Sequence, residues 1–229
     1  MTPFKMDSRM PVLLLALTVV FFGCAPQVAQ RARPGFKEVG FYPALAGLEW
    51  TYVPEGEAVT ALPYRVRIEG PASFLGQEAL RVYVGGRGEE RRYYRQVSRG
   101  VRLLGFEDPS ARVSFAPPIL EYPPEELLEV GYRYGGRTEV KVELLPPSSP
   151  PEPLTQGLLS YTMEVLEKRA VQVPAGSFQI YRIRQVYKDE RGETPYEVWF
   201  APYVGEIRTR EGRILIETNF PLFPLGSIR

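Results

Sequence analysis

Short runs of alternating apolar and polar residues, separated by Gly and Pro, fill most of this chain. In the stretch 63–70, PYRVRIEG, the side chains of Tyr64, Val66 and Ile68 alternate with charged ones. The stretch 137–144, RTEVKVEL, alternates in the same way, and shorter β-prone runs lie at 80–84, 91–97, 101–106 and 161–173. A period of two residues is that of a strand with one buried face, and here turn signals recur about every ten residues. The pattern predicts a predominantly antiparallel β domain with little helix.

The strongest pattern lies between Val173 and Gly205. A turn at Pro174 and Gly176 precedes residues 178–187, which are rich in β-forming side chains. Residues 189–192 break this run, and Tyr196 begins a second one that ends before the next proline and glycine. We predict a β-hairpin here, with Gly176 at a turn position that requires a positive φ.

Prolines mark the expected interruptions. Pro117 and Pro118 predict a connection, because neither a central strand nor a helix interior tolerates such a pair well. Residues 124–128, PEELL, are typical of a single helical turn, with two glutamates at its positive end. The run 146–153, PPSSPPEP, is interpreted as a surface loop, with a docking site for a partner as the alternative.

The N-terminus predicts export and lipidation. Lys5 and Arg9 precede an apolar run at 11–22 that is too short to span about 30 Å of hydrocarbon, as in a secretory signal. The end of this run, FFGC, resembles the lipobox of bacterial lipoproteins, which implies cleavage before Cys24 and acylation of its thiol. Phe21 and Phe22 depart from the leucine and the small residue that are usual there. The alternatives are a free thiol after an ordinary signal peptide and an uncleaved anchor.

These features divide the chain into a lipoprotein signal peptide at 1–23, a flexible tether at 24–40 and a single β domain at 41–229. Ala25 follows the cysteine in place of the aspartate that marks inner-membrane retention in some enterobacteria, which favours the outer membrane, facing the periplasm. We expect the membrane to be a partner through lipid on Cys24.

Composition excludes several classes of function. Lys and Arg number 28 against 27 Asp and Glu, without a basic block, so we expect no nucleic-acid partner. The single cysteine excludes a disulfide within the chain and a site of several thiolates. Histidine is absent, and no G-x-S-x-G elbow or Asp-rich calcium loop occurs. We therefore predict no enzyme activity, no cofactor and no metal site.

Few residues remain as candidates for chemistry. Glu125 and Glu126 form a carboxylate pair, but adjacent glutamates are usually a solvated face. The stretch 91–95, RRYYR, fits contact with an anionic glycan or lipid head group, or an edge strand protected by charge. Trp50 and Trp199 lie among β-formers, which predicts that both are buried in the core, with ligand stacking as the alternative.

The two halves of the chain echo each other. Tyr42 and Pro43 precede a glycine and two aromatics, and Tyr122 and Pro123 precede a similar set. This echo is compatible with two duplicated meanders.

Three motifs carry a family resemblance: YPALAGLEWTY at 42–52, VPAGSF at 173–178 and VWFAPYVGEIR at 198–208. They resemble signatures of a broad group of poorly characterised bacterial envelope lipoproteins, in which tyrosine and glycine are commoner where Phe200 and Tyr203 stand here. Some members of that group are similar to the LolA and LolB carriers. The resemblance implies a curved antiparallel sheet, an open or incomplete β-barrel, around an apolar cavity.

Taken together, the sequence predicts a lipid-anchored cell-envelope protein that acts as a non-enzymatic binding or scaffold module. The alternative is a carrier of lipids or lipoproteins with an apolar groove. The expected partner is an apolar ligand or another envelope protein. A hydrolase is the weakest hypothesis, because no nucleophile with a base beside it is visible.

Overall fold

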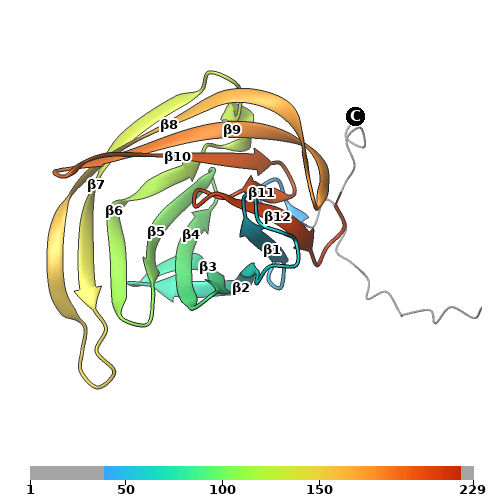
Figure 1. Cartoon of the computed structure of the whole chain (residues 1–229). Coiled ribbons are helices and arrows are strands. Elements are labelled where there is room, and N and C mark those ends of the chain that lie inside the picture. Colours follow the sequence, from blue (N-terminus) through green and yellow to red (C-terminus); the bar gives the residue numbers. More distant parts are fainter. Residues whose placement is uncertain (1–38, 223–229) are drawn as a thin grey trace, which may run out of the picture. The chain divides into compact units, whose positions relative to one another are not determined.

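The computed structural model describes residues 39–222, which form a closed barrel of twelve antiparallel strands (Figure 1). The strands are β1 (Glu49–Pro54), β2 (Tyr64–Phe74), β3 (Gln77–Gly86), β4 (Glu89–Val97), β5 (Val101–Glu107), β6 (Ala111–Tyr122), β7 (Arg133–Leu144), β8 (Glu152–Val173), β9 (Gly176–Asp189), β10 (Gly192–Ala201), β11 (Gly205–Arg208) and β12 (Arg213–Thr218). Each strand pairs with the next one along the chain. The predicted all-β antiparallel fold is confirmed, and so is the predicted hairpin, as β9 and β10.

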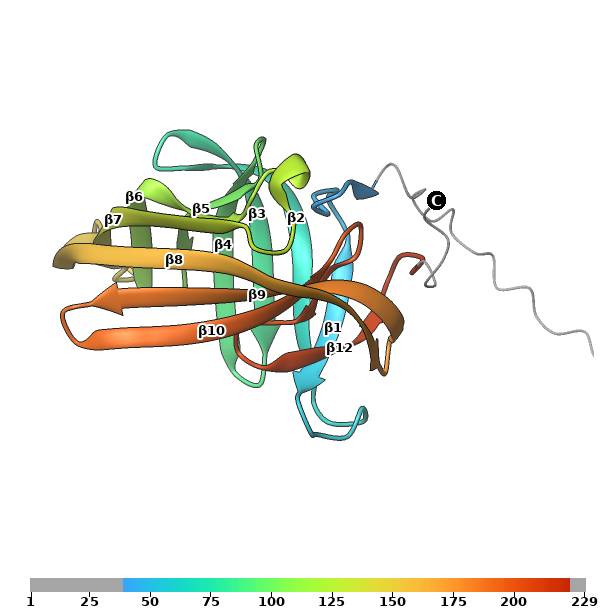
Figure 2. The ribbon, with the colours of Figure 1, turned by 90° about the horizontal axis from the view of Figure 1, so that it is seen from above.

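The barrel is closed by the pairing of β1 with β12, which lie side by side in Figure 2, whereas the family resemblance implied an open or incomplete barrel. Trp50 lies opposite Val66 of β2 and also opposite Thr218 of β12. Closure pairs the backbone N–H and C=O groups that an edge strand would leave unpaired. This contact joins residues far apart in sequence, so local alternation does not reveal it.

The pair Pro117 and Pro118 does not form the predicted connection, because β6 runs through it. Pairing with β7 ends at Ala116, and pairing with β5 shifts register between Ser114 and Ile119, the stretch that contains the two prolines. Proline has no N–H to donate, so it is tolerated where the ladder is already interrupted. The hydroxyl of Thr138 donates to the carbonyl oxygen of Pro117 at 2.7 Å. The predicted helical turn is confirmed as a 3₁₀ turn, η1 (Glu125–Leu127).

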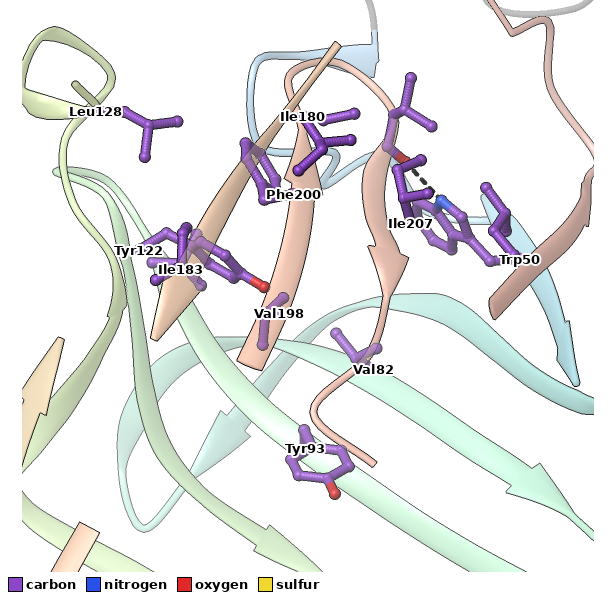
Figure 3. Close-up of a cluster of buried hydrophobic side chains, with 14 of the residues drawn as sticks. Trp50, Val82, Tyr93, Tyr122, Leu128, Ile180, Ile183, Val198, Phe200 and Ile207 are labelled. Carbon is purple, nitrogen blue, oxygen red and sulfur yellow. Dashed lines mark hydrogen bonds between the residues drawn. The ribbon is translucent and has the colours of Figure 1, made fainter. Parts of the chain in front are cut away.

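A large hydrophobic core lies inside the barrel (Figure 3), and Phe74, Tyr94 and Leu104 form a second, smaller cluster. Trp50 is 4 % exposed, and its indole Nε1 donates to the carbonyl oxygen of Val204 at 2.6 Å. Its ring meets that of Phe220 edge to face, with centroids 5.2 Å apart. The prediction that Trp50 is buried is therefore confirmed.

The same prediction for Trp199 is wrong. Its neighbours Val198 and Phe200 are buried, so strand alternation places the indole on the outer face, where it is half-buried. The guanidinium groups of Arg169 and Arg208 lie 5.1 and 5.7 Å from its ring. Cation–π contacts of this kind stabilise a half-buried aromatic side chain on the outer face of a barrel.

The signal-peptide segment, Cys24 and nearly all of the tether lie outside the described residues, so their assignments stay predictions. Within residues 39–222 no helix is long and apolar enough to cross a membrane.

Candidate functional site

The turn between β11 and β12, residues 209–212, projects into the barrel. Figure 3 shows the chain after Ile207 passing Val82 and approaching Tyr93. The turn is closed by a hydrogen bond from the Gly212 N–H to the Thr209 carbonyl oxygen at 3.0 Å. It carries Arg210 across the interior, where the guanidinium reaches the carboxylate of Glu121 on β6. The barrel is thus partly filled by its own hairpin.

Glu121 is the centre of a buried charge cluster. Its side chain is fully buried, and it binds both Arg210 and Arg95, the latter through Nε at 2.6 Å. The amide of Gln185 donates to the backbone oxygen of Glu121 at 3.0 Å. Burial opposes ionisation of Glu121, but the two arginines outweigh it and lower the pKa of the carboxyl. Both arginines are 19 % exposed in their side chains.

Glu206 on β11 adds a second carboxyl to the same interior. The hydroxyl of Tyr122 donates to its Oε1 at 2.7 Å, and the hydroxyl of Tyr52 donates to its backbone oxygen at 2.8 Å. Burial raises the pKa of Glu206, although Arg95 and Arg210 oppose this change. Burial also raises the pKa values of the two tyrosines, so both stay protonated donors. The pKa values of the two carboxyls are therefore shifted in opposite directions, down for Glu121 and up for Glu206.

A cavity of about 100 Å³ lies beside this cluster. The strands β2 and β3 contribute only apolar side chains to its lining: Val66, Ile68, Leu80, Val82 and Val84. The charged side chains come from β4 and from the segment 206–213: Arg95, Glu206, Arg210, Glu211 and Arg213. The cavity therefore has one apolar and one polar set of walls, contributed by different strands.

The side chains of residues 91–95 lie on the two opposite faces of β4. Arg95 points into the barrel, whereas Arg92 lies near Glu69 and Glu90, which it meets at 3.7 and 2.9 Å. The interpretation of this stretch as a protected edge is wrong, because β4 pairs with both β3 and β5. Glu125 and Glu126 are exposed on η1 and do not line the cavity, as a solvated face requires.

Sequence reasoning missed Glu121, Glu206 and Arg210. A signal for Glu121 was present, since it stands inside the apolar run ILEY at the end of β6. Its partners Arg95 and Arg210 come from β4 and from the turn between β11 and β12, which are distant in sequence, so no local pattern identifies them. Among the described residues no group of three or more Cys, Asp or Glu is arranged to hold a metal ion.

No family model matches the chain, and no curated protein matches it. The chain is similar to two solved structures. One is a protein classified as exported, with a YMCC-like fold, from Bacteroides fragilis, at 12 % identity and a TM-score of 0.47. The other is a protein classified as a lipoprotein, from Parabacteroides distasonis, at 9 % identity and a TM-score of 0.34.

Each of the two alignments covers 78 % of this chain and 98 % of the other protein. Likeness at this level leaves the function to be judged from this chain's own residues. The motif resemblance to envelope lipoproteins and to the LolA and LolB carriers stays a prediction.

Proposed function

We propose that this chain is a lipid-anchored protein of the bacterial cell envelope, and that its barrel is a non-enzymatic binding module for a small ligand. The observation that carries the proposal is the cavity inside the closed barrel, with its apolar set of walls from β2 and β3 and its polar set from β4 and residues 206–213. Ligand sites are typically concave and mostly apolar, with a few polar groups that orient the ligand.

The charge cluster supports a binding role. Replacing a buried ion pair by well-packed apolar side chains is often neutral or stabilising, so such a pair is weak evidence for stability alone. Arg95 and Arg210 nevertheless line the cavity and are each 19 % exposed in their side chains. Among residues 39–222, the side-chain hydrogen bond to Glu206 is the one from Tyr122 to Oε1. These polar atoms are available to a molecule that enters.

The volume of the cavity favours this proposal over a lipid carrier. Sites for drug-sized ligands occupy about 300 to 1,000 Å³. The cavity of about 100 Å³ is well below that range, and a whole lipid does not fit it. A carrier would require the barrel to widen, so the binding module is the better-supported function.

Native mass spectrometry of the full-length protein extracted from its own membranes tests the cavity as a binding site. We expect a small ligand to stay with the wild type and to be lost from Val66→Phe, whose ring would occupy the cavity. Val59→Phe is the matched control, because Val59 is 52 % exposed and does not line the cavity. An empty wild type with a stoichiometric protein partner would instead favour a scaffold and refute the cavity proposal.

Anchoring is proposed through acylated Cys24 in the outer membrane, facing the periplasm, and it needs a separate test. Each buried methylene contributes about 0.8 kcal/mol, so two or more long chains hold a protein stably where one is marginal. Mass spectrometry of the membrane fraction should find an acylated peptide that begins at Cys24. Cys24→Ala should leave the precursor uncleaved or the protein unanchored. A processed, soluble protein with a free thiol would contradict the assignment.

A further inference from the structure

The charged side chains around the cavity balance one another. Arg95 and Arg210 both bind the carboxylate of Glu121, and Glu206 supplies a second carboxyl to the same interior. Two basic groups therefore stand against two acidic ones. This cluster has no excess of either sign that a charged ligand would neutralise.

The other two charged side chains of the lining, Arg213 and Glu211, leave this balance in place. Arg213 binds Glu89 and lies over the ring of Tyr64, so it has its own counter-charge. Glu211 is 38 % exposed in its side chain and lies 4.0 Å from Nε of Arg210, so solvent screens it. A charged ligand would bring an unmatched charge into the barrel, and burying such a charge is costly. The walls therefore favour an uncharged ligand.

Two groups of the lining keep polar atoms open to a ligand. Arg95 donates to Glu121 from Nε at 2.6 Å and from Nη2 at 3.4 Å. Glu206 accepts from Tyr122 through Oε1 at 2.7 Å. Within residues 39–222, Nη1 of Arg95 and Oε2 of Glu206 have no hydrogen-bond partner, yet neither atom is fully buried, so both border open space. Arg95 and Glu206 both line the cavity but do not pair with each other.

A hydroxyl group fits these two atoms. It both accepts and donates a hydrogen bond, so it accepts from Nη1 of Arg95 and donates to Oε2 of Glu206. If Oε2 carries a proton, the hydroxyl accepts from it instead, so the fit does not depend on the protonation state of Glu206. An ammonium group has no acceptor to offer Arg95, and a carboxylate has no donor to offer an ionised Glu206.

The apolar walls and the volume restrict the rest of the ligand. The side chains that β2 and β3 contribute to the lining offer no hydrogen bond, so the part of the ligand against them is hydrocarbon. A cavity of roughly 150 Å³ holds benzene, so a cavity of about 100 Å³ holds about four non-hydrogen atoms.

Resting on the proposed cavity-binding function, we propose that the ligand is a short-chain alcohol of about three carbons. Its hydroxyl bridges Nη1 of Arg95 and Oε2 of Glu206. Its hydrocarbon chain packs against the apolar side chains of β2 and β3.

Methyl NMR spectroscopy of the full-length protein in lipid nanodiscs, with labelled valine side chains, tests this proposal. The probes are propan-1-ol, 1-chloropropane, acetate and propylammonium, which are equal in the number of non-hydrogen atoms and differ in charge and hydrogen bonding. The methyl groups of Val66 and Val84 report on the cavity that they line. Those of Val59 and Val130, 52 % and 54 % exposed and outside the lining, report on unspecific effects of each probe.

We expect propan-1-ol to shift the Val66 and Val84 signals saturably and to leave those of Val59 and Val130 in place. A hydrogen bond to a charged group changes affinity by about tenfold or more. The other three probes should therefore bind at least about tenfold more weakly than propan-1-ol.

A series of alcohols measures the length of the site. Affinity should rise about fourfold from ethanol to propan-1-ol, for one added methylene, and should fall at pentan-1-ol, which exceeds the volume. Val84→Ala removes hydrocarbon from the wall and should move the optimum to a longer alcohol, as reported by Val66. Val59→Ala is the matched control and should keep the optimum of the wild type. The methyl spectrum itself verifies that each variant is folded, and the comparison of probes on the wild type stands without any variant.

The outcomes separate the two proposals. Equal binding of 1-chloropropane and propan-1-ol would overturn the alcohol inference and leave the cavity as an apolar binding site. Tighter binding of acetate or propylammonium would also overturn it and assign the site to a charged ligand. If no probe shifted the Val66 and Val84 signals saturably, the cavity would hold only water, and the proposed function would fail with the inference.

Discussion

Replacing Glu121 by glutamine should strongly destabilise the barrel. The substitution keeps the shape of the side chain but removes the negative charge that faces Arg95 and Arg210. Glu121 is 0 % exposed, and each arginine is 19 % exposed in its side chain, so solvent screens the cluster little. Removing one partner of a buried ion pair typically costs about 3 to 5 kcal/mol, because the remaining charge is left uncompensated.

Urea denaturation of the wild type and of Glu121→Gln measures this loss directly. A free-energy change of 1 kcal/mol shifts the Tm of a domain of this size by about 2 to 4 °C, so a drop of about 6 °C or more is expected. The matched control is Glu193→Gln. Glu193 pairs with Lys188 at 3.0 Å, but both side chains are more than half exposed, and such pairs contribute about 0 to 1 kcal/mol.

The pH dependence gives a second, independent readout. The pKa of Glu121 is lowered in the folded protein, so its stabilising effect is complete above about pH 4.3, the ordinary value for glutamate. That effect is lost as the pH falls through the lower folded pKa. The stability difference between wild type and Glu121→Gln should therefore shrink in acid. If Glu121→Gln lost as little stability as Glu193→Gln, and the loss did not change with pH, the cluster would be solvated and this reasoning would be refuted.

Three further substitutions test the packing of the barrel by thermal melting. Trp50→Ala should lower the free energy of unfolding by about 3 to 5 kcal/mol. Trp199→Ala should lower it by only about 1 kcal/mol, because the indole lies on the outer face between two arginines. Equal losses would contradict this assignment of the two side chains. Tyr203 has a φ of 63°, so Tyr203→Gly should be about 1 kcal/mol more stable than Tyr203→Ala, and the reverse order would count against backbone strain there. Gly176→Val should lower the free energy of unfolding by about 1 to 3 kcal/mol, because valine is strained at the φ of 135° found there. Gly157→Val should lower it less, because that position is open and has no positive φ.

The sequence alone predicted the strands and most of their faces. Alternation over 63–70 correctly assigned Val66 and Ile68 to the inside, and the same rule applied to Val198 and Phe200 would have placed Trp199 outside. The turn at Gly176 was also predictable, because positive φ is a local requirement that glycine meets. These features depend on neighbouring residues, and neighbouring residues are what a sequence pattern records.

Only the tertiary structure decided the closure of the barrel and the position of the candidate site. The pairing of β1 with β12 joins Trp50 to Thr218, and the interior cluster joins Arg95, Glu121 and Arg210 from three separate parts of the chain. From the local sequence alone, an arginine next to an apolar residue is assigned to the surface. It is placed inside the barrel here because a carboxylate from a distant strand offsets the cost of burying it, and that offset exists only once the whole sheet has closed.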